Sequence, residues 1–365
     1  MKHAVIAPSS LYRTVACRGW IKQASVVPAT DPDPSAAEGT AGHWVATEMK
    51  RGRMPAVGSA DPAGTEITQE MVDGGAMWVE ALEGFPDTPE TPVAIPRIHA
   101  DCWGTPDSWQ WNPATHTLRV ADYKFGHRYV DVFENWQLVA YAAGVMDELR
   151  LNDDSVILEL MVVQPRSYHK DGPVRTWTVA ATKLRALVNI AHGAAHEALT
   201  ERPNTMSGPH CLDCPARVSC PTLARTVYSI LDWTGVADPI MSTPGDIGRE
   251  LRLVEDAQQR LKARQTGLKA QAETMLRQGK DVPFYALEDT VGRLAWTAPI
   301  DEVEAIASML GRSVLAPREM VTPTQARDRK LLPPDILAQY STRPRTGKAL
   351  VRDDKLGASK VFEKL

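Results

Sequence analysis

The chain has 365 residues, of which 43% are hydrophobic and 24% charged, so it is long enough to bury one large or two medium cores. Its formal net charge of -4 excludes the basic balance typical of a strong phosphate-binding footprint, so any such surface must be local. No apolar run reaches the length of a membrane span, and the N-terminal apolar stretch is too brief for a signal-peptide core. We therefore expect a cytoplasmic protein without membrane contact.

Three helices are predicted in the first 84 residues. The first begins near Ser9, because serine suits the cap position before a helix, and it ends near Cys17. The second covers residues 39–52, with His43 near its start, and the third covers residues 67–84.

The middle of the chain alternates between strands and helices. Strands are predicted at residues 91–104, 117–126, 156–166 and 174–180, and helices at residues 134–150 and 181–201. The first two strands are expected to form an antiparallel pair, joined by a turn-rich segment. This order favours an α/β fold with a mixed central sheet flanked by helices.

A domain boundary is expected near residue 225, where the following segment loses periodicity and gains proline and glycine. Residues 1–225 would form one domain, and residues 226–365 would form a mainly helical C-terminal region. A long helix with an apolar stripe is predicted at residues 246–278, and its length favours a bracing role.

The region after this helix is predicted to contain two short strands, at residues 282–289 and 291–298, and a helix at residues 301–311. The last 24 residues carry seven basic and three acidic side chains. This tail either touches phosphate or is simply a solvated terminus.

Asp122 and Lys124 form an Asp-x-Lys at the end of a predicted strand, where residues two apart point to the same face. Taken alone, such a pair is more often an ordinary ion pair on the surface. Asp101 would lie beside Asp122 if the two strands pair, which would give two carboxylates for Mg²⁺ or Mn²⁺. A metal next to a lysine suits phosphodiester hydrolysis.

Three further residues could complete this site. Gln137 and Tyr141 lie four residues apart on the next helix, and therefore on one face of it. They could hold the substrate backbone or Lys124, or they could be an exposed amide and a core aromatic. His43 could supply a nitrogen ligand, which would favour Mn²⁺ somewhat, or it could be structural.

The cysteines form a second group. Cys211, Cys214 and Cys220 follow a C-x2-C-x5-C pattern, and Cys17 could be brought to them as a fourth ligand. Four thiolates suit a 4Fe-4S cluster or structural Zn²⁺, and the distant fourth ligand favours the iron-sulfur cluster. Reduced thiols without metal are the alternative, and Cys102 is expected to be a buried small apolar residue.

Six segments in this order resemble the RecB-type branch of the PD-(D/E)xK nuclease superfamily, in particular its iron-sulfur members. These members are the CRISPR-associated and AddB-type nucleases and related phage exonucleases. The segments are SSLYRTVAC, EGTAGH, IHADCWG, VADYKFG, NWQLVAYAAG and CLDCPARVSC.

The resemblance implies a restriction-endonuclease-like core and a metal-dependent exonuclease that acts on DNA ends. His43, Asp101, Asp122 and the backbone carbonyl of Tyr123 would bind the metal, and Lys124 would be the catalytic lysine. Gln137 and Tyr141 would contact DNA.

The sequence around Gln137 is most similar to that of phage-encoded members. These are expected to resect DNA for recombination, beside a single-strand-annealing partner, in a bacterial cytoplasm. The four cysteines would hold a structural cluster. Two alternatives are a DNA-binding or scaffolding module of the same fold without catalysis, and a zinc-stabilised metabolic enzyme of unrelated fold.

Overall fold

The computed structural model of the protein describes residues 4–27, 34–84, 90–232 except 168 and 170, and 244–287, together with residues 305 and 309. The described residues up to Leu287 belong to one compact unit. None of the helices in these stretches is long and apolar enough to cross a membrane. Most of the region predicted to follow the long helix, including the basic tail, lies outside the described residues.

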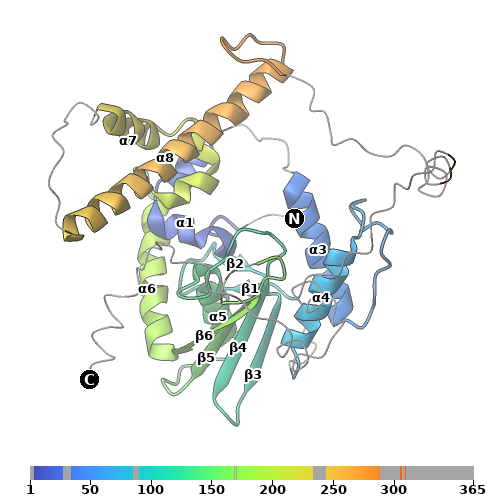
Figure 1. The fold of residues 1–365 in the computed structure, drawn as a ribbon. Coiled ribbons are helices and arrows are strands. Elements are labelled where there is room, and N and C mark those ends of the chain that lie inside the picture. Colours follow the sequence, from blue (N-terminus) through green and yellow to red (C-terminus); the bar gives the residue numbers. More distant parts are fainter. Residues whose placement is uncertain are drawn as a thin grey trace. The chain divides into compact units, whose positions relative to one another are not determined.

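The centre of the fold is a four-stranded sheet in the order β3 (Ser108–Asn112), β4 (Thr117–Tyr123), β5 (Ile157–Val163) and β6 (Val174–Ala180). The pairs β3–β4 and β5–β6 are antiparallel, whereas β4 and β5 are parallel. A parallel pair needs a crossover, and α5 (Trp136–Glu148) provides it. The predicted mixed α/β fold is confirmed (Figure 1).

Helices cover both faces of the sheet. One face packs against α5 and α6 (Ala181–Ala198), with α1 (Leu11–Ala16) on these two helices, in the largest of three buried apolar clusters among the described residues. The other face packs against α3 (Pro34–Lys50) and α4 (Gln69–Ala81) in the second cluster. Figure 1 shows these helices on opposite sides of the strands. The end of the sheet is therefore a place where groups from both helical layers can meet.

Strand β4 contributes to both layers because its side chains alternate. Val120 belongs to the cluster on the α5 side, and Tyr123 belongs to the cluster on the α3 side. Two helical glycines allow this close approach. A Cβ on Gly42 would lie 2.5 Å from the Phe125 ring, and one on Gly74 would lie 2.6 Å from the Tyr123 hydroxyl.

The predicted strand at residues 91–104 is wrong. The segment contains two short strands, β1 (Val93–Ala94) and β2 (Trp103–Gly104), which pair with each other across a turn. Backbone bonds from Ile98 N to Ile95 O and from Cys102 N to His99 O close that turn. The partner of β4 is instead β3, which lies in the segment predicted to be a turn.

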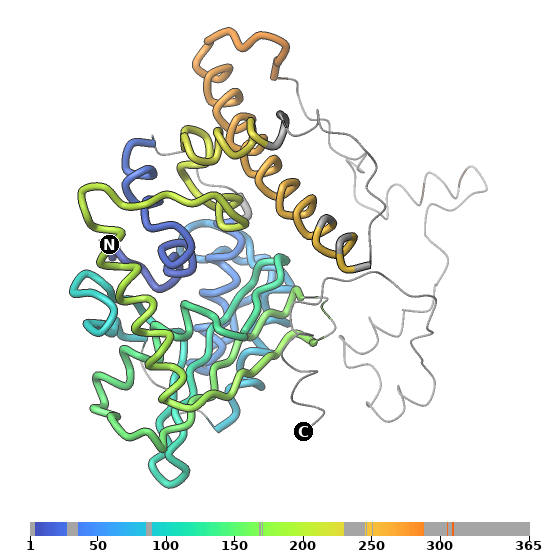
Figure 2. Tube along the Cα trace, turned by 90° about the vertical axis from the view of Figure 1, so that its left-hand side faces the viewer, coloured from blue at the N-terminus to red at the C-terminus, as the bar shows by residue number. Residues whose placement is uncertain are grey.

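The cysteine-rich segment forms two short 3-10 helices, η2 (Pro209–Asp213) and η3 (Pro215–Val218), followed by α7 (Pro221–Asp232). The predicted long helix is present as α8 (Pro244–Arg277), and it packs against η2, η3 and α7 (Figures 1 and 2). A bracing role for this helix stays a prediction. A short helix, α2 (Trp20–Ala24), was not predicted, and the described residues 282–287 contain no strand.

Candidate functional site

Asp122 and Lys124 lie at the C-terminal end of β4, where it runs beside β5. The Lys124 Nζ lies 2.8 Å from Asp122 Oδ2 and 3.1 Å from Asp122 Oδ1. The side chain of Asp122 is only 2% exposed, whereas that of Lys124 is 30% exposed. The pair is thus a buried carboxylate held by a partly exposed ammonium. It is not the ordinary surface ion pair that an Asp-x-Lys more often forms.

Gln137 connects this pair to α5. The side chain of Asn135 caps the helix by accepting from the backbone N–H groups of Gln137 and Leu138, which fixes the first turn. The Gln137 Nε2 donates to Asp122 Oδ1 at 2.8 Å, and its Oε1 accepts from Lys124 Nζ at 3.0 Å. One turn later, the hydroxyl of the buried Tyr141 accepts from Gln137 Nε2 at 3.4 Å. An amide suits this place because it offers a donor to the carboxylate and an acceptor to the ammonium.

The carboxylate next to Asp122 is Asp107, and the expectation that Asp101 lies there is wrong. Ser108 of β3 pairs with Ala121 of β4, so Asp107 stands opposite Asp122 across the strand pair. Asp101 lies in the turn between β1 and β2, its side chain is 61% exposed, and its carboxylate is 3.7 Å from the His99 ring. The error follows from pairing β4 with the wrong upstream segment.

Asp107 is also bonded to two other predicted site residues. Its Oδ2 accepts the backbone N–H of Tyr123 at 2.8 Å and lies 3.0 Å from His43 Nε2. His43 comes from α3, in the layer opposite α5, and its ring packs edge-on against that of Tyr123 at 5.8 Å. The structure therefore brings His43, Asp122, Lys124, Gln137 and Tyr141 to one end of the sheet.

The charges at this end of the sheet are strongly coupled. Burial raises the pKa of Asp122 to about 6, even though Lys124 lies beside it, and the charge of Asp107 acts in the same direction as burial. Burial by itself would raise the pKa of Asp107, but His43 holds that pKa below its usual value. At neutral pH both carboxylates are therefore ionised.

The two basic residues, His43 and Lys124, have their pKa values raised by these carboxylates. Burial alone would lower the pKa of His43, but the charge of Asp107 and the hydrogen bond to it raise this pKa to about 9. Burial also opposes the charge on Lys124, yet Asp122 and Asp107 outweigh it and raise the pKa of Lys124. Two anions thus face two cations, and a divalent ion bound here would compete with the imidazolium proton, because histidine binds metal only as the neutral ring.

The four cysteines predicted to form a cluster come together beside α8. They line one small cavity and reach it from the end of α1, from η2, from the junction with η3 and from the start of α7; they are Cys17, Cys211, Cys214 and Cys220. The first three are buried, and all five cysteines of the chain are free thiols. Cys102 is 1% exposed and lies in the large apolar cluster, as predicted.

The donor chemistry of the four thiols fits a thiolate-bound metal centre. The backbone N–H groups of Met206 and Gly208 point at the sulfurs of Cys17 and Cys211, each at 3.4 Å, and such bonds favour thiolate ligands. Burial raises the pKa of Cys211 to about 11, with the neighbouring thiols adding to the effect, so without a cation the Cys211 thiol is protonated. Within the described part of the chain, no three His, Cys, Asp or Glu side chains already stand in an arrangement that could hold a metal ion.

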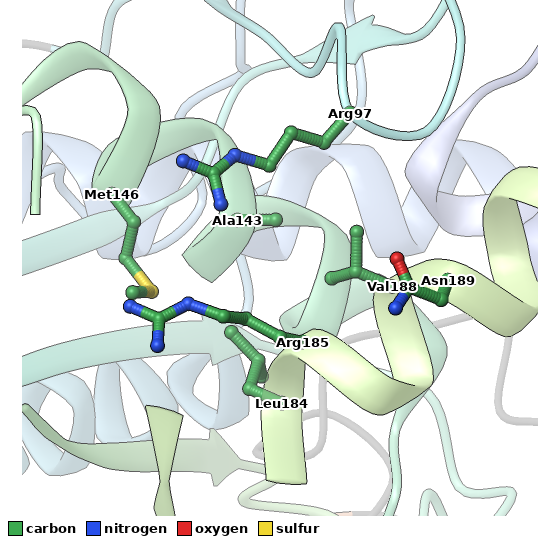
Figure 3. Close-up of a pocket in the computed structure, with 7 residues that line it drawn as sticks. All are labelled: Arg97, Ala143, Met146, Leu184, Arg185, Val188 and Asn189. Carbon is green, nitrogen blue, oxygen red and sulfur yellow. The ribbon is translucent and has the colours of Figure 1, made fainter. Parts of the chain in front are cut away.

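A separate cavity lies between α5 and α6, toward the end of α5 that is remote from Gln137 (Figure 3). Its floor is apolar, and two arginines border it: Arg97, which pairs with Asp147, and Arg185, which pairs with Asp154. It contains none of the predicted site residues. The cavity is therefore distinct from the Asp122 cluster.

The fold and the two clusters define a mixed α/β protein that gathers two carboxylates, a lysine and a glutamine at the end of its sheet and four thiols beside its long helix. A family model described as a protein of unknown function, DUF2800, matches residues 88–352, well over half of the chain. The chain belongs to this family. The matched region includes Asp107, Asp122 and Lys124 and continues through α8, whereas His43 and Cys17 precede it.

Proposed function

We propose that the protein is a metal-dependent deoxyribonuclease of the RecB-type PD-(D/E)xK kind that hydrolyses phosphodiester bonds at DNA ends. The observation that carries this proposal is the meeting of two carboxylates from neighbouring strands, Asp107 and Asp122, with the Lys124 ammonium 2.8 Å from Asp122. Acidic oxygens beside a lysine are the groups that phosphodiester hydrolysis uses.

Asp107 takes the place in this proposal that the sequence had given to Asp101. Asp107, Asp122 and, after losing its proton, His43 would hold Mg²⁺ or Mn²⁺, with the Tyr123 carbonyl as a further oxygen ligand. The metal would supply a polarised phosphoryl oxygen and a bound water of lowered pKa. Because His43 shares a proton with Asp107, metal binding at this site would release that proton.

The other residues act on orientation and charge. The Lys124 ammonium stabilises negative charge that develops on the phosphate or orients the attacking water. Gln137 holds Lys124 and Asp122 in register through one amide, and we assign it a positioning role in place of direct contact with DNA. Tyr141 stays protonated because burial raises its pKa, so its hydroxyl serves as a hydrogen-bonding group and not as a base.

The four-cysteine cavity would hold a 4Fe-4S cluster, or structural Zn²⁺, through Cys17, Cys211, Cys214 and Cys220. Its role in the proposal is structural, because the thiols lie in a segment separate from the Asp122 cluster and tie α1 to η2, η3 and α7. The proposed activity would place the protein in the cytoplasm, on DNA ends, beside a single-strand-annealing recombination partner.

The test is release of nucleotides from linear duplex and single-stranded DNA with Mg²⁺ or Mn²⁺. We expect release by the wild type and its loss in Asp122→Ala and Lys124→Ala, with both variants still folded by circular dichroism. Equal and negligible release by all three proteins would reject the enzyme and leave a DNA-binding module of the same fold. Release by both variants at the wild-type rate would reject the assigned site.

A further inference from the structure

The loop that follows Lys124, residues 126–130, is held by hydrogen bonds from buried side chains. Gln164, at the end of β5, is fully buried. Its Nε2 donates to the carbonyl oxygens of Gly126 at 2.7 Å and Arg128 at 2.6 Å, and its Oε1 accepts the Val130 N–H at 3.1 Å. A single amide therefore fixes the backbone of the loop at three points.

A second buried side chain completes this anchor. Arg175 of β6 is 5% exposed and donates to Gln164 Oε1 at 2.7 Å and to the Val130 carbonyl at 3.0 Å. Its guanidinium also lies 4.8 Å from the centre of the Tyr129 ring. The carbonyls of the loop consequently face the protein, while His127 and Arg128 are exposed.

The side chain of Arg128 is fixed separately, by the cysteine-rich segment. The guanidinium is 66% exposed, and its Nη1 donates to the carboxylate of Asp213, which lies between Cys211 and Cys214. The Tyr12 hydroxyl of α1 also donates to that carboxylate, at 3.4 Å. Both ends of Arg128, its backbone and its guanidinium, are therefore held by parts of the chain distant in sequence.

We propose that Arg128 binds a backbone phosphate of the DNA next to the bond that is cleaved, and that Gln164 and Asp213 are positioning residues for it. This inference rests on the proposed function. Arg128 follows Lys124 by four residues, so the two cations lie on one continuous stretch of chain. A guanidinium has five N–H donors, and the ion pair with Asp213 leaves most of them for a phosphate.

This assignment also gives the cysteine-rich segment a role beyond stability. Asp213 is part of η2, and its neighbours Cys211 and Cys214 line the thiol cavity. The ordering of η2 therefore sets the place of Asp213 and, through it, the direction of the Arg128 guanidinium. Phosphate contacts of this kind position the nucleic acid without reading its sequence.

The experiment measures binding of a short linear duplex at several salt concentrations, with Ca²⁺ replacing Mg²⁺, and steady-state cleavage with Mg²⁺. For Arg128→Ala we expect about tenfold weaker binding and a slope of log K against log salt that is smaller by about 1. KM should rise while kcat changes little. Arg128→Lys should keep the salt slope but bind more weakly, because a bidentate geometry is lost.

Two further variants make the result specific. Arg185→Ala is the matched control, because Arg185 also pairs with one aspartate but lies near the start of α6. This helix follows Ala180, which pairs with Ile157 at the start of β5, so Arg185 is at the opposite end of the sheet from Lys124. It should bind and cleave as the wild type does. Asp213→Asn should raise KM like a weaker form of Arg128→Ala while leaving the salt slope unchanged, because the arginine charge remains.

The outcomes separate this inference from the proposed function. If Arg128→Ala binds DNA with the wild-type affinity and salt slope while Asp122→Ala abolishes cleavage, the inference is wrong and the nuclease stands. If Arg128→Ala and Arg185→Ala lose the same affinity, the effect is one of net charge and the inference is also wrong. If the wild type neither binds nor cleaves DNA, the proposed function fails and the inference fails with it.

Discussion

At the scale of single residues, Asp107 and Asp101 make the sharpest comparison. Asp107 accepts hydrogen bonds from Tyr123 N–H and His43 beside the buried Asp122, whereas Asp101 is exposed in a turn near His99. We expect Asp107→Ala to lower the Mg²⁺-dependent cleavage rate by about 10²- to 10³-fold, the range typical of removing one preorganised catalytic group, because the variant loses one of the two carboxylates proposed to hold the metal. The measurement is kcat on linear DNA.

The matched control is Asp101→Ala, which should keep kcat within about twofold, since surface substitutions away from a site change little. The reverse result, an active Asp107→Ala and an inactive Asp101→Ala, would restore the residue that the sequence favoured. It would also require the β1–β2 turn to reach the lysine in the DNA complex.

The sequence carried enough information to find Asp107, but the choice of strand partner concealed it. The segment from Ser108 to Asn112 alternates serine, tryptophan, glutamine, tryptophan and asparagine, and a proline-containing turn separates it from β4. An alternating run joined to a strand by a short turn is the pattern of a hairpin. With this hairpin, the register places Asp107 opposite Asp122. The prediction instead took the longer apolar segment, residues 91–104, as the strand that pairs with β4.

A cluster of three histidines should make the stability of the protein depend on pH. Three imidazoles lie in a row between α6 and the β1–β2 turn, with His99 and His196 ring centres 4.7 Å apart and those of His192 and His196 4.3 Å apart. Burial lowers the pKa of His196, and the charges of His192 and His99 lower it further. The carboxylate near this group is Asp101, 3.7 Å from the His99 ring, and Arg97 accepts from His192 through its carbonyl.

Because the folded pKa of His196 is depressed, the unfolded chain binds the proton more tightly. The contribution to stability is therefore complete above the unfolded pKa, near 6.5, and it is lost as the pH falls from there toward the folded pKa. Asp122, whose folded pKa is raised to about 6, acts in the opposite direction over the same pH range, so the His196 effect is measured as a difference. We expect the urea midpoint of the wild type to fall relative to that of His196→Gln between about pH 7 and pH 5. A constant difference between the two midpoints would assign the acid sensitivity to other groups.

At the scale of elements, the packing of α4 on β4 depends on a missing side chain. A Cβ on Gly74 would lie 2.6 Å from the Tyr123 hydroxyl and 3.1 Å from Pro165. Gly74→Ala should therefore cost about 1–3 kcal/mol through overpacking, although alanine is the better helix former. Urea unfolding of the purified protein measures this cost.

Gly193 of α6 is the opposite case, because a Cβ there would meet no atom within 4 Å. Gly193→Ala should stabilise the protein by about 0.5–1 kcal/mol, the difference in helix propensity between the two residues. If both substitutions shift the midpoint in the same direction, packing against Tyr123 does not determine the place of α4.

The helices and strands of the core were predictable because their patterns are local. The periodicity of β4, α5, β5, β6 and α6 is set by burial on defined faces, and each was placed within a few residues of its observed ends. The helices α2 and α7 were missed for different reasons. The helix α2 has only five residues, and its stability comes from tertiary contacts that a single sequence does not display. The helix α7 has a pronounced amphipathic pattern, with Leu223 and Val227 buried, so its sequence did contain the signal of a helix.

At the scale of the whole molecule, the four cysteines connect distant parts of the chain. Cys17 caps the C-terminal end of α1, and the other three lie about 190–200 residues later, beside α8. The polar bridge from Asp213 to Arg128 joins the same segment to the loop after Lys124. Loss of order at the cysteines should therefore lower both the stability of the protein and its affinity for DNA, and the effect on stability should be the larger of the two.

Removing two of the four cysteines tests the proposed metal centre directly. A metal centre that joins Cys17 to the later cysteines closes a loop of about 190 residues, and loop-closure entropy makes such a cross-link worth on the order of 4–5 kcal/mol. Cys211→Ala combined with Cys214→Ala should therefore lower the melting temperature and remove bound iron. Cys102→Ala, a buried cysteine outside the cavity, should keep the iron and lose only a small packing contribution.

Metal analysis and absorption near 400 nm separate the two candidate centres. Iron with absorption in this range in the wild type supports the 4Fe-4S cluster, and a colourless protein with one equivalent of zinc supports the alternative. A double variant with unchanged melting temperature and unchanged metal content would refute the assignment. In that case the four thiols that meet beside α8 would be packing residues, and the Asp213–Arg128 bridge would still join this segment to the loop after Lys124.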